Sequence, residues 1–299
     1  MSLYTMKKVI TIVGPTASGK SDLGVKIAKE IDGEIISADS RQVYIGLDIG
    51  SGKITPEEME CIRHHMLDVE DPKNIFSVGE YTKMARSYME DIWKRGKNPI
   101  VVGGTGFYID SLINNREYPN VPENYKLREE LSLLSKKDLQ KKLETLDPDR
   151  YETIDKDNPV RLIRAIEIAS VLGKVPTVEE KEKEFELIQV GIKVAKDILE
   201  NKIHERLYKR VEEGMVEEVE RLHRNGLSYE RMEDLGLEYR YVSRYIKGEL
   251  SKEEMLKELE SEIHKYAKRQ MTWFRKNKDI VWFEDKKKAL DYMKKHVTD

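Results

Sequence analysis

The chain has 299 residues, of which 36% are charged and 39% hydrophobic, and 53 Lys and Arg against 56 Asp and Glu give a net charge of −3. Because nucleic-acid-binding proteins usually carry a basic excess, any such surface must come from local segregation of charge. The single cysteine, Cys61, excludes an internal disulfide and a cysteine-based zinc site. No apolar run approaches the roughly 20 residues that cross a bilayer, and no signal peptide opens the chain, so we expect a cytoplasmic protein without a membrane segment.

The first motif lies between a strand pattern and a helix pattern. The β-branched run Val9–Val13 predicts a buried strand, and Asp22–Glu30 has apolar residues at helical spacing. Between them the chain fits the P-loop pattern G-x-x-x-x-G-K-[ST], with Gly14, Pro15, Thr16, Ala17, Ser18, Gly19, Lys20 and Ser21. Such a loop presents backbone N–H groups and a helix N-terminus to a phosphate. Lys20 is expected to reach the terminal phosphoryl oxygens, and the Ser21 hydroxyl is expected to bind Mg²⁺.

The next elements continue an alternation of strands and helices. The segment 33–40 predicts a short strand with a polar tip, 78–94 predicts a helix, and 98–106 predicts a buried strand that runs into a glycine turn. This order indicates an α/β fold, with a parallel sheet like that of P-loop NTPases and flanking helices. Ligands bind such sheets at the carboxyl ends of the strands. We therefore expect the P-loop, Asp39-Ser40 and Gly103-Gly104-Thr105 to surround one crevice.

The composition changes near Tyr118. Prolines punctuate helical, charge-rich pieces from there to Phe185, which predicts a smaller all-helical insertion over 118–185. The segment 187–194 then alternates like a returning strand, the rest is helical, and 280–283 predicts a late edge strand. The catalytic core is thus expected to comprise residues 6–117 and 186–299.

Asp39 and Thr105 are the candidate chemical groups at the predicted strand ends. Asp39 could bind Mg²⁺ through the water shell of Ser21, act as a general base, or cap a helix. Thr105 could hydrogen-bond a phosphate or a base, or serve as a helix N-cap. The strand before Thr105 ends in Gly-Gly-Thr, without the aspartate that P-loop NTPases place at the end of a second strand. This absence argues against ATP hydrolysis and favours a diphosphate that does not belong to a nucleotide.

Other polar residues allow both functional and structural interpretations. Adjacent residues on a strand point to opposite faces, so His64 and His65 are not expected to share a metal ion. Arg161 and Arg164 share a helix face, which suits backbone phosphates or a partner carboxylate. Arg206 could clamp a diphosphate, although its pattern alone favours a surface salt bridge. The segment 264–278 interleaves cations with aromatics, as a nucleic-acid surface or an ordinary amphipathic helix would.

Several motifs in this order resemble the tRNA dimethylallyltransferase (isopentenyltransferase) family over nearly the whole chain. They are the P-loop at 14–21, Asp39-Ser40-Arg41-Gln42-Val43-Tyr44, Gly46-Leu47-Asp48-Ile49-Gly50, His64-His65-Met66-Leu67-Asp68, Val102-Gly103-Gly104-Thr105-Gly106-Phe107-Tyr108, Asp157-Asn158-Pro159-Val160-Arg161-Leu162-Ile163-Arg164-Ala165 and Lys268-Arg269-Gln270-Met271-Thr272-Trp273-Phe274-Arg275.

The resemblance implies a Mg²⁺-dependent prenyltransferase. Such an enzyme moves a dimethylallyl group from dimethylallyl diphosphate to the exocyclic N6 of the tRNA adenosine just 3′ of the anticodon. By motif match, the P-loop with Lys20 and Ser21 holds the diphosphate and its Mg²⁺, and Thr105 and Arg206 help hold the leaving diphosphate. Asp39 takes a hydrogen bond or proton from N6. The resemblance assigns tRNA contacts to Asp39, Ser40, Arg41, Gln42, Thr105, Arg128, Arg161 and Arg164. The insertion is expected to bind the anticodon stem-loop of the tRNA. We expect the protein to be a monomer.

The chain departs from the family at one place, and alternatives remain open. Family members carry an Ile-Gly-Tyr-Lys/Arg-type segment where this chain has Leu235-Gly236-Leu237-Glu238-Tyr239-Arg240, so no tRNA contact is transferred to that loop. The alternatives are a cytokinin-forming prenyltransferase acting on AMP or ATP, a P-loop small-molecule kinase, and a non-catalytic RNA-binding protein. The helical insertion argues against the first, Gly103-Gly104-Thr105 against the second, and intact Lys20, Ser21 and Asp39 against the third.

Overall fold

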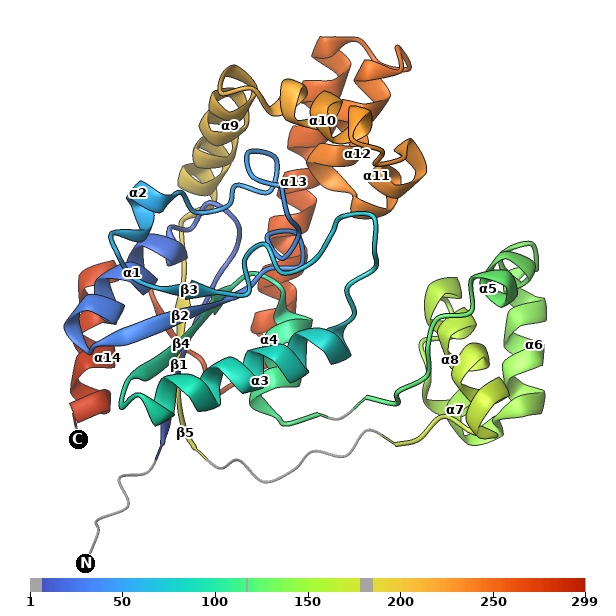
Figure 1. The fold of residues 1–299 in the computed structure, drawn as a ribbon, viewed down its shortest axis with the longest axis horizontal. Helices are drawn as coiled ribbons and strands as arrows, with labels where there is room; N and C mark the ends of the chain where they lie inside the picture. Colours follow the sequence, from blue (N-terminus) through green and yellow to red (C-terminus); the bar gives the residue numbers. More distant parts are fainter. Residues whose placement is uncertain (1–6, 117, 178–184, 299) are drawn as a thin grey trace, which may run out of the picture. The chain divides into compact units, whose positions relative to one another are not determined.

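The computed structural model describes residues 7–116, 118–177 and 185–298. The chain divides into two compact units: a core unit within Met1–Asn115 and Glu182–Asp299, and an inserted unit, Arg116–Lys181. The core unit contains the sheet, and the inserted unit is helical (Figure 1).

The core unit is built on a parallel sheet, as the alternation of elements predicted. Its strands in the described residues are β1 (Lys8–Val13), β2 (Gly33–Ala38), β3 (His64–His65), β4 (Asn98–Gly103), β5 (Glu186–Ile192) and β6 (Val281–Phe283). Their order is β3-β2-β4-β1-β5-β6, and every neighbouring pair is parallel. The late edge strand is confirmed in β6. The carboxyl ends of β1, β2 and β4 therefore lie side by side at one edge of the sheet.

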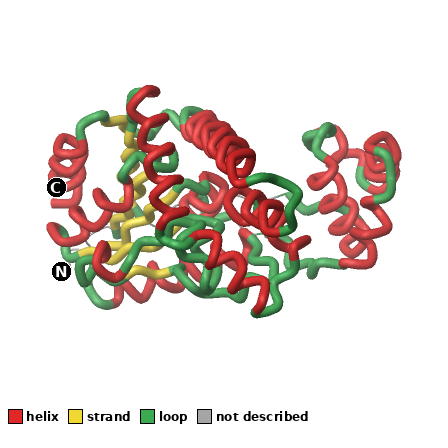
Figure 2. The backbone as a smooth tube through the Cα atoms, turned by 90° about the horizontal axis from the view of Figure 1, so that it is seen from above, coloured by secondary structure: helices red, strands yellow, loops and turns green. Residues whose placement is uncertain are grey.

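Both faces of the sheet are covered by helices (Figure 2). Ile10 and Ile12 of β1 join the apolar cluster formed with α1 (Lys20–Glu30) and α14 (Lys286–Thr298). Val9 and Val13, which point the other way, join the cluster of α3 (Val78–Lys94) and α4 (Gly106–Ile113). This two-sided burial explains why the strand sequences are almost uninterrupted apolar runs.

The remaining helices of the core unit follow β5, apart from the short α2 (Pro56–Met59). They are α9 (Lys196–Glu212), α10 (Met215–Arg224), α11 (Tyr229–Leu235), α12 (Leu237–Ile246) and α13 (Lys252–Phe274). The long helix α13 begins with a capping box of Ser251 and Glu254 and contacts α4, α9 and α12. This places one face of α13 beside the P-loop edge of the sheet.

The inserted unit has a hydrophobic core of its own. It contains α5 (Tyr125–Ser132), α6 (Lys136–Leu146), α7 (Pro148–Thr153) and α8 (Pro159–Leu172). Each helix starts at a side chain that accepts a backbone N–H of the first turn: Asn124, Ser135, Asp147 and Asn158. Leu139, Leu143, Leu162 and Ile166 are buried together. The helical insertion expected from the prolines is therefore confirmed.

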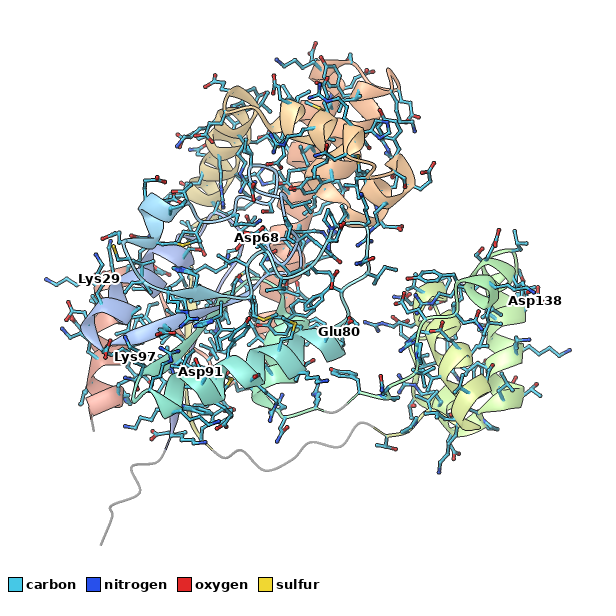
Figure 3. The ribbon with its side chains drawn as sticks, viewed as in Figure 1. Lys29, Asp68, Glu80, Asp91, Lys97 and Asp138 are labelled. Carbon is cyan, nitrogen blue, oxygen red and sulfur yellow. The ribbon has the colours of Figure 1, made fainter. Side chains whose placement is uncertain are left out.

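Many charged side chains, Lys29 and Lys97 among them, lie on the outside of the core unit (Figure 3). Lys29 pairs with Glu60 across the surface, and the Lys97 ammonium lies 2.7 Å from the Asp32 carboxylate. Such exposed pairs contribute at most about 1 kcal/mol each, so the apolar layers carry most of the stability. Within the described residues, no helix is both long and apolar enough to cross a membrane.

Candidate active site

A polar cavity lies at the carboxyl ends of β1, β2 and β4, where the crevice was predicted. Including its open mouth, the cavity encloses about 1040 Å³. Residues far apart in the sequence contribute its charged and polar lining, among them Lys20, Ser21, Asp39, Ser40, Arg41, Gln42 and Arg206. The sheet topology thus brings the P-loop and the Asp39 segment to one site.

The P-loop is shaped by residues with positive φ. Gly19, at φ 78°, is the N-cap of α1, so the helix N-terminus opens directly at Lys20. The Lys20 ammonium donates to the Pro15 carbonyl at 3.2 Å. The Ser18 hydroxyl is buried and has no hydrogen-bond partner among the described residues. A loop of this kind, with a hydroxyl and a helix N-terminus still to be satisfied, is suited to an anion.

Two buried cations, Lys20 and Arg206, line the cavity. The pKa of Lys20 is lowered to about 8, mainly by burial; Asp39 opposes this shift, and the nearby Arg206 adds a smaller lowering. Burial likewise lowers the pKa of Arg206 to about 10, with Arg210 adding to the effect. Buried cations whose pKa values are lowered in this way form a site that a multiply charged anion would stabilise.

Asp39 follows β2 and shapes its own turn. Its Oδ1 accepts the backbone N–H of Arg41 at 2.9 Å and, more weakly, that of Gln42 at 3.4 Å. This Asx-type turn fixes the carboxylate at the cavity wall, opposite the P-loop lysine. The placement agrees with a group that acts on a bound substrate.

Thr105 ties the neighbouring strand end to the Asp39 segment. Thr105 precedes α4 as its N-cap residue, yet its side chain makes no capping bond. Instead its hydroxyl accepts the backbone N–H of Ser40 at 3.0 Å. Tyr266 of α13 also bonds to Thr105, and burial raises the pKa of this phenol to about 12. Thr105 therefore links β4, the Asp39 segment and α13.

Arg206 points into the cavity from α9. Its Nη2 donates to the Gly52 carbonyl at 3.2 Å. The sequence pattern alone favoured a surface salt bridge for Arg206, and that prediction is wrong. Arg206 is separated by one helical turn from Arg210, which also lines the cavity, and this spacing was a signal that sequence analysis missed.

Gln270 is a second residue that the sequence analysis did not single out. Its Oε1 accepts the Thr16 N–H of the P-loop at 2.8 Å, and its Nε2 donates to the Gly104 carbonyl at 3.0 Å. The available signal was a polar side chain on the apolar face of α13, in register with Ala267 and Phe274. In the segment 264–278, Gln270 thus joins α13 to the P-loop and to the end of β4. Lys268 and Arg269 of the same segment are exposed.

The segment that departs from the family pattern also reaches the cavity. Leu237 and Glu238 line it, and the Glu238 carboxylate lies 3.1 Å from the Arg210 guanidinium. Burial raises the pKa of Glu238, although Arg210 counteracts the shift. The acidic residue therefore balances one cation of the cavity.

The arginines of the inserted unit differ in exposure. Arg128 and Arg164 both pair with the buried Glu167 of α8, Arg128 at 2.8 Å. Arg161, whose side chain is 57% exposed, pairs with Asp155 at the surface. Arg161 is therefore the most accessible of the three for an external phosphate.

The two adjacent histidines serve different contacts. The His65 Nε2 lies 2.7 Å from the buried Glu34 carboxylate, whereas the His64 Nδ1 lies 2.9 Å from the Ile62 carbonyl. No cluster of three metal-ligating acidic, histidine or cysteine side chains occurs in the part of the chain that is described.

The donor set at the P-loop nevertheless fits Mg²⁺. Ser21 and Asp39 both line the cavity and offer hard oxygen ligands. Mg²⁺ commonly binds through one or two protein oxygens, with substrate phosphates and waters completing its octahedron.

Fold and site together define a P-loop α/β protein with an electropositive anion site beside a carboxylate. The chain belongs to the IPP transferase family, whose model matches residues 42–277. It is 43% identical to the tRNA dimethylallyltransferase 1 of Geotalea uraniireducens, over 90% of this chain and 88% of that protein.

Solved structures agree with this membership. The full-length tRNA isopentenylpyrophosphate transferase of Bacillus halodurans is similar with a TM-score of 0.74 and 33% identity, over 98% of this chain and 96% of that one. A eukaryotic dimethylallyltransferase acting on tRNA has a TM-score of 0.75 at 27% identity, over 90% of this chain and 70% of that one.

Proposed function

We propose that the protein transfers a dimethylallyl group from dimethylallyl diphosphate to N6 of the tRNA adenosine 3′-adjacent to the anticodon, with release of diphosphate. The observation that carries the proposal is the electropositive P-loop cavity that opens onto Asp39. The β4 end, Gly103-Gly104-Thr105, offers no second carboxylate, which disfavours a kinase or ATPase. The names of the family's curated relatives support the same reaction.

The P-loop, residues 14–21, holds the diphosphate of the donor. Its backbone N–H groups and Lys20 bind the phosphoryl oxygens, and Arg206 faces them from α9. As the bond between the allylic carbon and the diphosphate oxygen breaks, negative charge grows on the leaving group. Lys20 and Arg206 are already desolvated there, so they stabilise this charge without reorganisation. Thr105 supports this wall through Ser40.

Asp39 acts on the acceptor. The adenosine must leave the base stack for its N6 to reach the cavity. N6 then bonds to the allylic carbon, and the Asp39 carboxylate takes the proton that N6 loses. Ser40, Arg41 and Gln42 line the same wall and contact the flipped base and its neighbours. Holding donor and acceptor in line supplies much of the rate enhancement.

Mg²⁺ would bind together with the diphosphate of the prenyl donor. Ser21 would hold it, with Asp39 within reach through water, and the ion would neutralise diphosphate charge.

The insertion, residues 118–185, binds the anticodon stem-loop. Arg161 is exposed for a backbone phosphate, and Arg128 and Arg164 are partly exposed beside Glu167. A tRNA substrate implies a cytoplasmic location, and we propose that the protein works as a monomer.

The test is an incubation with labelled dimethylallyl diphosphate, Mg²⁺ and unmodified bulk tRNA, with AMP and ATP in parallel tubes. We expect label in tRNA at an adenosine beside the anticodon. Label in AMP or ATP alone would make the protein a cytokinin-forming enzyme and remove the tRNA role of the insertion. Transfer to none of the acceptors would contradict the proposal and favour the kinase alternative.

A further inference from the structure

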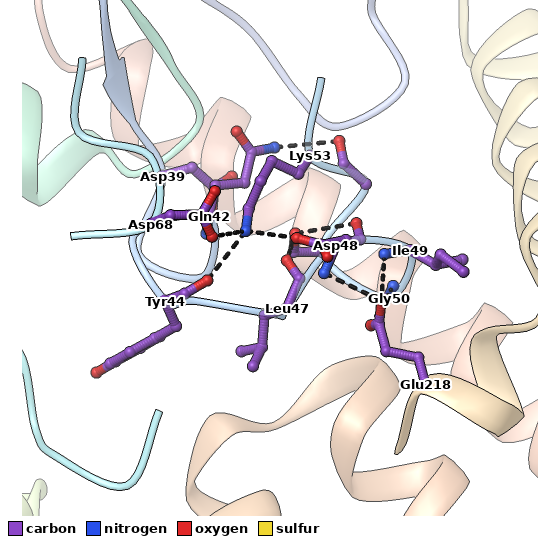
Figure 4. Close-up of polar contacts among 12 residues, drawn as sticks. Asp39, Gln42, Tyr44, Leu47, Asp48, Ile49, Gly50, Lys53, Asp68 and Glu218 are labelled. Atoms are coloured by element: carbon purple, nitrogen blue, oxygen red, sulfur yellow. Dashed lines mark hydrogen bonds and ion pairs between the residues drawn. The ribbon is translucent and has the colours of Figure 1, made fainter. Parts of the chain in front are cut away.

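Residues 48–52 form a loop, here called the 48–52 loop, whose backbone N–H groups are hydrogen-bonded by a buried carboxylate. Glu218 of α10 is fully buried, and its two oxygens accept the backbone N–H groups of Asp48 at 3.1 Å, Ile49 at 2.7 Å and Gly50 at 3.0 Å (Figure 4). Tyr239 of α12 donates its hydroxyl to Glu218 at 3.1 Å and accepts the Ser51 N–H at 3.1 Å. Four successive N–H groups are thereby fixed by two side chains.

The carbonyls of the same loop hold the proposed substrate-binding residues. The Gly52 carbonyl accepts from Arg206 at 3.2 Å and from Gln42 at 3.2 Å. The Gly50 carbonyl accepts from Arg210 at 3.3 Å. One peptide group thus joins a residue of the donor side, Arg206, to a residue of the acceptor side, Gln42.

The loop has little freedom to move without disturbing these contacts. A Cβ atom at Gly50 would lie 2.9 Å from the Tyr239 hydroxyl and 3.3 Å from Glu218. A Cβ at Gly52 would clash with the guanidinium groups of Arg206 and Arg210. Any shift of the loop is therefore passed on to the arginines.

We infer that Glu218 and Tyr239 are positioning residues, which act through the 48–52 loop to place Arg206 against the donor diphosphate and Gln42 against the acceptor base. Neither residue lines the cavity, so neither touches a substrate. The inference rests on the proposed function for the identity of the two substrates, while the contacts that carry it lie within the core unit. Tyr239 belongs to the segment 235–240, for which no tRNA contact was transferred from the family.

The first measurement is the affinity for Mg²⁺-diphosphate, by calorimetry, of full-length wild type, Glu218→Gln and Tyr239→Phe. In Glu218→Gln one acceptor oxygen becomes an NH₂ group that faces backbone donors, and Tyr239→Phe removes the hydroxyl and keeps the ring. Both are expected to weaken binding about tenfold, because a buried N–H loses its acceptor and the loop shifts. The matched control is Glu217→Gln, a neighbouring exposed carboxylate on α10, which is expected to bind as wild type does.

The decisive measurement repeats each substitution in an Arg206→Ala background. If Glu218 acts through Arg206, its substitution has no further effect on diphosphate affinity there, because the group it positions is already gone. Equal fold-losses in both backgrounds would overturn the inference and leave Glu218 a general stabiliser of the fold. If Glu218→Gln fails to fold by circular dichroism, Tyr239→Phe, the smaller change, carries the same comparison.

A steady-state measurement tests the acceptor side. The KM for tRNA is expected to rise in Tyr239→Phe, whereas in a Gln42→Ala background Tyr239→Phe should raise it no further, because the residue it positions is already gone. An unchanged tRNA KM would limit the inference to the donor side and contradict the role of the shared Gly52 carbonyl. Because the diphosphate assay needs no turnover, a wild type that binds diphosphate but transfers nothing to tRNA would refute the proposed function separately.

Discussion

At the scale of single residues, Asp39 has a structural and a chemical task that substitution can separate. One carboxylate oxygen holds the turn by accepting the Arg41 N–H, a contact that an asparagine oxygen also makes. Asp39→Asn is therefore expected to keep the fold and the tRNA affinity while lowering kcat by roughly 10²- to 10⁴-fold, the usual contribution of a general base. Single-turnover rates and filter binding with tRNA measure the two effects. Asp39→Ala serves as the comparison, since it loses both tasks. If Asp39→Asn lost tRNA affinity and kept its turnover, the proton-accepting role would be wrong.

The buried ammonium of Lys20 lowers the free energy of unfolding of the unliganded protein. Its pKa is about 8 in the folded protein against 10.5 in the unfolded chain. Between these values the unfolded state binds more protons, so stability rises with pH, and the penalty for the buried charge is complete only below pH 8. Lys20→Met is expected to abolish Mg²⁺-diphosphate binding yet stabilise the unliganded protein at pH 7. The gain should be on the order of 1 to 2 kcal/mol, because water still reaches part of the side chain.

Urea unfolding at pH 7 and pH 10 measures this effect. The stability gap between Lys20→Met and wild type should shrink at the higher pH, where wild-type Lys20 is neutral in the folded state. The control is Lys26→Met, which removes an exposed ammonium from the same helix and should show no such pH dependence. A gap that is equal at the two pH values would exclude the buried charge as its cause.

At the scale of elements, Gln270 fastens α13 to two glycine-containing loops. Gln270→Met fills a similar volume but leaves the Thr16 N–H and the Gly104 carbonyl without their partner. We expect a loss of about 1 to 3 kcal/mol in the free energy of unfolding. The KM for the prenyl donor should also rise, because Thr16 lies in the P-loop. Urea unfolding and donor-dependent kinetics measure both effects, with the exposed Thr272→Ala on α13 as control. A stability loss with an unchanged donor KM would show that Gln270 supports the fold alone.

The elements that sequence analysis predicted are those with local signals. The P-loop was recognisable because strand, glycines and helix are contiguous, and the crevice followed from the rule that parallel strands share their carboxyl ends. Gln270 and Glu218 were not predicted as site supports, because their partners lie 166 residues or more away along the chain. No periodicity or propensity encodes such a contact, since it depends on how helices after β5 fold back onto the loops of the sheet. The helix pattern alone favoured a surface salt bridge for Arg206, and that interpretation was wrong for the same reason, whereas the family resemblance assigned Arg206 to the diphosphate.

At the scale of the whole molecule, two units with separate cores divide the proposed work. The core unit holds the cavity, and the inserted unit has its own apolar cluster with Glu167 buried beneath Arg128 and Arg164. Removing Arg164 would leave a buried carboxylate with fewer partners, so Arg164→Ala is expected to destabilise the inserted unit by about 1 to 3 kcal/mol. Any loss of tRNA affinity in that variant would then combine two causes. A substitution of Arg161 separates the loss of a tRNA contact from the loss of stability.

Arg161 offers the cleaner test of tRNA binding. Its exposed pair with Asp155 adds little stability, so Arg161→Ala should unfold at the same urea concentration as wild type. If Arg161 contacts a backbone phosphate, its removal should weaken tRNA binding and reduce the slope of log affinity against log salt by about 1. Arg161→Lys is the control, because it keeps the charge and should preserve most of the slope. Binding measured across several salt concentrations decides the matter: a slope that is unchanged in Arg161→Ala would remove this residue from the tRNA interface and shift the search to the exposed cations Lys268 and Arg269 of α13.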